Sequence, residues 1–226
     1  MPENLIHPIQ AVIFDMDGLM LNTERIARLA WKRAAADWDR TLSDERFAAI
    51  AGLKADDANA VLQKAFGPDF PVEEARARRQ QYYKAYIEEH GIDLKPGLLP
   101  LLRRIEVLGL PHAVASSTAR PGIAHKLTIA GLMNRFDTWV GGDEIANGKP
   151  APDIFLTAAE RLGIAPRHCM VLEDSEPGIR AAHAAGMLPI MVPDVKQPSP
   201  EVEALAYAVL PSLADVVLLL ERLARA

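Results

Sequence analysis

Short apolar runs alternate with amphipathic segments along most of this chain. The runs have the length of strands and end at polar residues or glycine; they are Ala11–Phe14, His112–Ala115, Thr138–Val140, Cys169–Leu172 and Leu188–Val192. Strands that are apolar throughout and alternate with helices are typical of a parallel sheet covered on both faces. Because Pro189 cannot donate a ladder hydrogen bond, we expect the last of these strands at an edge of the sheet.

The segments between these runs carry apolar residues at helical spacing. In the second half of the chain they are Leu98–Leu108, Pro152–Leu162, Glu176–Ala185 and Ala214–Leu223. Three of them are directly followed by a glycine, the residue that commonly ends a helix. The pattern predicts an α/β fold whose core is a Rossmann-like parallel sheet.

The region between the first strand and Pro96 departs from this alternation. It contains no convincing strand, and its helical segments are Glu24–Trp38, Ser43–Ala51, Ala55–Phe66 and Val72–His90. One helix is enough to connect two parallel strands, so four are too many for a simple crossover. We therefore expect a small helical cap domain at residues 23–94, inserted into a core domain formed by residues 1–22 and 95–226.

Composition excludes several classes of protein. The 226 residues are 50% hydrophobic and carry 25 basic and 30 acidic side chains, a net charge of −5 that argues against broad binding to nucleic acid. Cys169 is the only cysteine, which excludes a disulfide framework and a cysteine-rich zinc site. We see no apolar stretch long enough for a membrane span and no signal peptide, so we expect a cytoplasmic protein without membrane contact. The pattern leaves the oligomeric state open, with a monomer favoured.

Polar residues follow the apolar runs at the end where parallel sheets bind ligands. Asp15 and Asp17 follow the first run, Ser116–Thr118 the second, and Glu173 and Asp174 the fourth, while Lys149 lies in a loop after the third. Carboxylates gathered at one edge repel one another unless a cation is present. Their oxygens suit Mg²⁺, so we expect a magnesium site there. On its own, the Ser116–Thr118 cluster is also compatible with capping of the next helix.

Four segments together resemble the haloacid dehalogenase-like hydrolase superfamily, in the branch that contains β-phosphoglucomutase and small sugar-phosphate phosphatases. They are FDMDGLMLNTE (Phe14–Glu24), VASST (Val114–Thr118), GKPAPDIF (Gly148–Phe155) and LEDSEPGIRAA (Leu172–Ala182). Asn22 departs from the pattern, since many relatives have an aspartate there. The resemblance implies a phosphatase that acts on a small phosphorylated metabolite through an aspartyl-phosphate intermediate.

The resemblance also implies a role for each site residue. Asp15 is the expected nucleophile, and Asp17 the acid that protonates the leaving oxygen and the base that later activates water. Ser116 and the backbone amide of Ser117 would bind the transferred phosphoryl group, and Lys149 would balance the local charge. Mg²⁺ would be bound by Asp15, the Asp17 carbonyl and Asp174, with Glu173 as a direct ligand or one acting through water.

Two residues of the expected cap are candidate substrate contacts. Lys54 lies where relatives often place a substrate-specificity loop, and Arg79 falls near a phosphate-contacting lysine of the mutases. The alternative for both is an ordinary solvated helix face.

Two other functions remain open at this point. A phosphosugar mutase would use the same nucleophile, but the mutases carry a histidine four residues beyond the Thr of the first motif, and this chain has Ala27 there. This difference favours hydrolysis. A phospho-Asp signalling module, of the receiver type, also combines an aspartate, a Ser or Thr and a lysine, but it is shorter and lacks a helical insert. The sequence does not identify the natural substrate.

Overall fold

The computed structural model describes residues 8–53 and 55–223, and they form two compact units. The first unit is discontinuous and contains the chain up to Leu21 and from Leu94 onward; the second comprises Asn22–Asp93. Every strand within the described residues belongs to the first unit.

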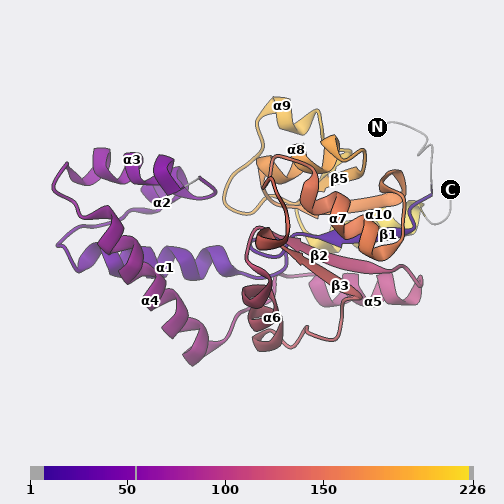
Figure 1. The fold of residues 1–226 in the computed structure, drawn as a ribbon, viewed down its shortest axis with the longest axis horizontal. Coiled ribbons are helices and arrows are strands. Elements are labelled where there is room, and N and C mark those ends of the chain that lie inside the picture. Colours follow the sequence, from indigo (N-terminus) through magenta and orange to yellow (C-terminus); the bar gives the residue numbers. More distant parts are fainter. Residues whose placement is uncertain (1–7, 54, 224–226) are drawn as a thin grey trace. The chain divides into compact units, whose positions relative to one another are not determined.

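The first unit is built on a parallel sheet (Figure 1). Its strands, in the spatial order β3-β2-β1-β4-β5-β6, are β3 (Thr138–Gly141), β2 (His112–Ser116), β1 (Ala11–Phe14), β4 (Cys169–Glu173), β5 (Leu188–Met191) and β6 (Ala208–Val209). Strand β1 lies in the middle and pairs with β2 through Phe14 and Val114 and with β4 through Phe14 and Leu172. The carboxyl ends of β1, β2 and β4 therefore meet at one edge of the sheet.

Helices cover both faces of this sheet, which explains why its central strands are apolar on both sides. Figure 1 shows α5 and α6 on one side of the strands and α7 and α8 on the other. The helices of this unit are α5 (Leu98–Val107), α6 (Arg120–Ile129), α7 (Asp153–Leu162), α8 (Glu176–Ala184), α9 (Pro200–Glu203) and α10 (Leu213–Leu223), with short 3-10 turns at Gly142–Glu144 and Pro166–His168. The core under α7 and α8 contains Ile13, Val171 and Phe155, all fully buried.

The second unit is helical and consists of α1 (Thr23–Ala36), α2 (Asp44–Ile50), α3 (Ala55–Phe66) and α4 (Val72–His90). Helix α1 packs along α4, and α2 packs against α3. Ser43 caps α2 by accepting a hydrogen bond from the Arg46 amide. Aromatic side chains fill part of its interior, where Phe70 meets the rings of Trp38 and Phe66.

The expected α/β class and the parallel sheet are confirmed, but the expectation for Pro189 is wrong. Strand β5 is not an edge strand, because β6 pairs with it through Ile190 and Met191. Pro189 still contributes an acceptor, since its carbonyl oxygen binds the Tyr207 amide at 2.8 Å, and this contact needs no N–H on the proline. Within the described residues, no helix is long and apolar enough to cross a membrane.

Candidate active site

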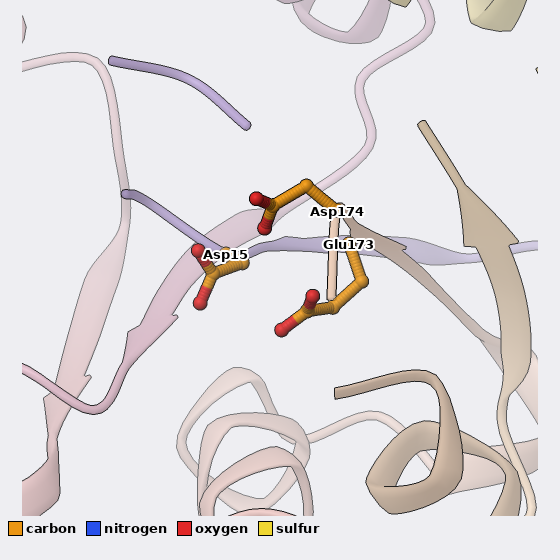
Figure 2. Close-up of side chains that lie close together, drawn as sticks. All are labelled: Asp15, Glu173 and Asp174. Atoms are coloured by element: carbon orange, nitrogen blue, oxygen red, sulfur yellow. The ribbon is translucent and has the colours of Figure 1, made fainter. Parts of the chain in front are cut away.

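Three acidic side chains meet at the carboxyl edge of the sheet (Figure 2). Asp15 directly follows β1, Glu173 is the last residue of β4, and Asp174 comes next. One carboxylate oxygen from each lies within 4.8 Å of the others. Asp15 and Glu173 are buried and Asp174 is partly buried. Three hard oxygen donors at this spacing are the donor set that suits a divalent cation such as Mg²⁺.

Lys149 joins two of these carboxylates. Its Nζ donates to Asp15 Oδ1 at 2.5 Å and to Glu173 Oε1 at 2.6 Å, and its side chain is only 6% exposed. Lys149 lies in the loop before α7, so the lysine that the sequence analysis selected reaches the ends of β1 and β4. A single lysine neutralises only one of the three negative charges.

The pKa values of these groups reflect the excess of buried negative charge. The pKa of Asp15 is raised from 3.8 to about 7, chiefly by burial; Lys149 lowers it, and the negative charge of Glu173 raises it. Burial also raises the pKa of Asp174 well above 3.8, with Glu173 and Asp15 as the next causes. For Lys149, burial lowers the pKa, but Asp15 and Glu173 raise it more, and the net direction is upward. A bound cation would favour the ionised carboxylates and relieve this excess.

Glycines allow the carboxylates to come this close to the backbone. A Cβ on Gly178, in the first turn of α8, would lie 1.9 Å from the Glu173 carboxyl group. Gly18 has φ +88°, and a Cβ there would lie 2.2 Å from Asp174 Oδ2. No other residue type fits either position without displacing an acidic side chain.

Glu173 has hydrogen-bond donors on both of its carboxylate oxygens. Oε1 accepts from Lys149, and Oε2 accepts from the Ser175 amide at 2.7 Å and the Ser175 hydroxyl at 2.8 Å. The same hydroxyl accepts from the Gly178 amide and caps α8. These contacts fix the Glu173 side chain, and they favour contact with a metal ion through water over direct ligation.

The loop after β2 brings hydroxyl groups to the same edge. Ser116 ends β2 and is buried, and its Oγ accepts a hydrogen bond from the Thr118 amide at 3.2 Å. The hydroxyl proton of Ser116 can therefore point toward another acceptor. The loop does not cap α6 as the alternative suggested, because Ala119 precedes that helix and no side chain caps it. Gly142 packs closely against this loop, because a Cβ on it would lie 2.4 Å from the Ser117 carbonyl oxygen.

Asp17 has partners that the sequence analysis did not find. Lys126 Nζ donates to Asp17 Oδ1 at 2.6 Å, and Thr118 Oγ1 donates to Asp17 Oδ2 at 2.8 Å. Lys126 lies in α6, 109 positions from Asp17 in the sequence. It lies within a helix, where the sequence carries no signal that indicates this contact.

The two candidate cap residues fall outside the first unit or outside the described residues. Arg79 lies in α4 of the second unit, where its guanidinium group is 5.0 Å from the Tyr83 ring centre and donates to Gln80. Lys54 lies outside the described residues.

Comparison with known proteins places this site in a family. Residues 9–186 match the family described as haloacid dehalogenase-like hydrolase. A Drosophila melanogaster protein named "Probable pseudouridine-5'-phosphatase" is 33% identical over 221 residues, which cover 95% of this chain and 94% of that protein. The β-phosphoglucomutase of Bacillus subtilis is 31% identical over 191 residues, covering 81% of this chain and 83% of the relative.

A solved structure agrees with these sequence relatives. The crystal structure of a hydrolase of the same family from Deinococcus radiodurans, with bound phosphate and sodium, has a TM-score of 0.82 and 28% identity. It covers 96% of this chain and 97% of its own. The receiver-type alternative does not agree with this match, whereas the expected resemblance and the expected class of enzyme, a phosphoric monoester hydrolase, are confirmed. The chain belongs to the haloacid dehalogenase-like hydrolases, in the branch that is similar to β-phosphoglucomutase.

Proposed function

We propose that this chain is a Mg²⁺-dependent phosphatase that hydrolyses small phosphomonoesters, sugar phosphates foremost, through an aspartyl-phosphate on Asp15. The observation that carries the proposal is the bridge from Lys149 to Asp15 and Glu173 beside Asp174. It supports the proposal because it joins the proposed nucleophile to a fixed cation and to further acidic side chains at the end of the central strand.

Hydrolysis proceeds in two displacements at phosphorus. In the first, a carboxylate oxygen of Asp15 forms a bond to phosphorus while the bond to the leaving oxygen breaks, and Asp17 gives its proton to that oxygen. In the second, Asp17 takes a proton from water, the water oxygen bonds to phosphorus, and the bond to Asp15 breaks. The products are the free alcohol and phosphate, and both aspartates return to their starting states.

The transferred phosphoryl group needs donors around its oxygens. Ser116 presents its hydroxyl proton from the end of β2, and the backbone amide of Ser117 follows in the same loop. Lys149 stays charged and places its positive charge beside Asp15. Donors fixed in advance stabilise the charge that develops in the transition state.

The carboxylates fit a magnesium ion, which Asp15, Asp174 and the Asp17 carbonyl would hold. Glu173 would act through water, because Lys149 and Ser175 already donate to its oxygens. The ion would supply positive charge to the phosphoryl oxygens and keep Asp15 ionised at neutral pH. Without that charge, the raised pKa of Asp15 leaves the nucleophile partly protonated near pH 7.

The helical unit Asn22–Asp93 would act as a cap that excludes water and contacts the leaving group. Arg79 and Lys54 remain our candidates for that contact. Replacing Lys54 with Ala should raise KM for the natural substrate more than for p-nitrophenyl phosphate, because the small aryl ester offers a cap residue little to bind. An equal effect on both substrates would return Lys54 to an ordinary surface role.

A mutase is the second candidate, because a β-phosphoglucomutase is among the relatives. Ala27 is buried in α1 and has no side-chain donor, so it cannot supply the contact that a histidine would make at this position. We expect net hydrolysis. Incubation with β-glucose 1-phosphate and a trace of the 1,6-bisphosphate separates the two functions, since a mutase would accumulate glucose 6-phosphate much faster than free phosphate.

Phosphate release tests the proposal directly. The purified protein should release phosphate from p-nitrophenyl phosphate and from members of a sugar-phosphate panel only when Mg²⁺ is present. The panel should include pseudouridine 5'-phosphate, after which the Drosophila relative is named. The Asp15→Asn variant keeps the volume of the side chain and should lose turnover; substantial remaining activity in this variant would show that Asp15 is not the nucleophile.

A further inference from the structure

We propose that Lys126 and Thr118 form a clamp that positions the carboxylate of Asp17 for proton transfer. The proposal rests on the proposed function, since it assigns positioning residues to its acid–base step. It separates two lysines by role: Lys149 serves the nucleophile Asp15, and Lys126 serves the acid–base residue Asp17.

The clamp contacts both oxygens of one carboxylate. Lys126 Nζ lies 2.6 Å from Asp17 Oδ1, Thr118 Oγ1 lies 2.8 Å from Asp17 Oδ2, and Lys126 Nζ lies 3.5 Å from Thr118 Oγ1. The side chain of Lys126 is 14% exposed and that of Asp17 is 26% exposed, so the pair is mostly shielded from water. Charge-assisted hydrogen bonds of this length fix the plane of the carboxylate as well as its place.

The two donors are themselves held by the core. Helix α6 is anchored by Ile123 and Leu127, both fully buried, and they flank the turn that carries Lys126. The Arg120 amide at the start of α6 donates to Asp143 Oδ1 at 2.7 Å. Thr118 belongs to the loop of Ser116, and its carbonyl oxygen accepts from the Gly142 amide. The clamp therefore connects Asp17 to the same loop that presents the phosphoryl-binding groups.

The two contacts hold the carboxylate while Asp17 exchanges a proton in the proposed mechanism. A carboxylate oxygen can accept more than one hydrogen bond, so the contacts to Lys126 and Thr118 do not by themselves exclude the leaving oxygen or water. In the proposed step, the proton that moves is the one on Asp17. Lys126 and Thr118 are accordingly positioning residues, which act through Asp17 and do not touch the reacting atoms.

The test compares leaving groups that differ in their need for an acid. The Lys126→Met variant should lose about tenfold in kcat for alkyl phosphates that the wild type hydrolyses, because a displaced acid transfers its proton poorly. It should lose less than about threefold for p-nitrophenyl phosphate, since this leaving group needs little protonation. Thr118→Val should show the same pattern more weakly. His125→Ala serves as the control: His125 is the exposed neighbour of Lys126 in α6, and its replacement should leave kcat for both substrate classes unchanged.

A double-mutant cycle shows whether Lys126 acts through Asp17. In the Asp17→Asn background, Lys126→Met should cause no further loss for either substrate class. Equal losses for alkyl and aryl esters, or losses that add to those of Asp17→Asn, would overturn the clamp and leave an ordinary structural ion pair.

A measurement that needs no turnover keeps the inference distinct from the proposed function. The downward shifts in melting temperature caused by Asp17→Asn and Lys126→Met should not add in the double variant, because each removes the same ion pair. A wild type that releases no phosphate from any ester would refute the proposed function alone. Additive shifts in melting temperature would refute the clamp whether or not the protein is active.

Discussion

Magnesium binding should weaken steeply as the pH falls from 7 to 5, because the carboxyl groups that would hold the ion also hold protons in this range. Burial raises the pKa of Asp15 from 3.8 to about 7, and burial together with Glu173 and Asp15 raises the pKa of Asp174. A metal ion binds the deprotonated groups, so each proton that must leave costs affinity.

The size of the effect follows from Asp15 alone. With a pKa of about 7 the group is half protonated at pH 7 and almost fully protonated at pH 5. The apparent Kd for Mg²⁺ should therefore be about 50-fold weaker at pH 5 than at pH 7, which corresponds to about 2.3 kcal/mol of binding free energy. The raised pKa of Asp174 acts in the same direction.

Without metal, the same groups should make the protein less stable as the pH rises. A folded-state pKa above the unfolded value of 3.8 means that the stabilisation is complete below that value and is lost as the pH rises through about 7. The free energy of unfolding of the metal-free protein should thus be larger at pH 5 than at pH 7.5. Added Mg²⁺ should raise the melting temperature more at pH 7.5 than at pH 5.

Calorimetric titration with Mg²⁺ and thermal unfolding between pH 5 and pH 8 measure both effects. Asp15→Asn is the matched control, because it keeps the volume and removes one titrating group. This variant should bind Mg²⁺ more weakly at pH 7 and show a smaller change in Kd with pH. An apparent Kd that is the same at pH 5 and pH 7 would refute the assignment of these carboxylates as the metal site.

Two substitutions test other parts of the site, and a third tests an ion pair in the turn after β3. Gly18→Ala would place a Cβ 2.2 Å from Asp174 Oδ2 and should abolish Mg²⁺ binding in titration while circular dichroism stays unchanged. Lys149→Met leaves buried carboxylates without their cation and should lower the free energy of unfolding by about 3–5 kcal/mol in denaturant titrations, besides removing turnover. In Glu144, hydrogen bonds from Arg161 are the largest cause of a pKa lowered from 4.5 to about 2, so its stabilisation is present above pH 4.5 and lost as the pH falls toward 2. Glu144→Gln should cost about 1–3 kcal/mol at pH 7 in the same titration, with a difference from wild type that shrinks toward pH 2.

The sheet could be predicted because its strands are buried on both faces and read as continuous apolar runs. The elements that escaped prediction have weaker signals. Strand β6 has two residues, Ala208–Val209, too few for any periodicity. Helix α6 carries Pro121 and Gly122 in its first turn, and only Ile123 and Leu127 of its side chains are fully buried, so its apolar stripe is narrow. The hydrophobic pattern of a segment indicates which of its residues are buried, and these two segments bury few side chains.

The cluster of acidic residues could be predicted for a topological reason. Parallel strands that neighbour one another end at the same edge, so residues that follow β1, β2 and β4 must meet even though they are far apart in the sequence. Lys149 could be predicted both from its place after the third apolar run and from its loop motif. Lys126 lies within a helix, and no rule of strand ends or motif spacing indicates which way a helical lysine reaches.

The two aspartates of the first motif differ in surroundings that only the tertiary structure supplies. Asp15 is buried against Lys149 beside two further carboxylates, whereas Asp17 is more exposed and is held by Lys126 and Thr118. Met16 between them is fully buried, so the two acidic side chains are separated by a residue anchored in the core. Acid–base and nucleophilic roles require carboxyl groups in unlike environments. In the proposed mechanism both acids act on one phosphoryl group, and the lysines that reach them from α6 and from the loop before α7 give the two acids different surroundings.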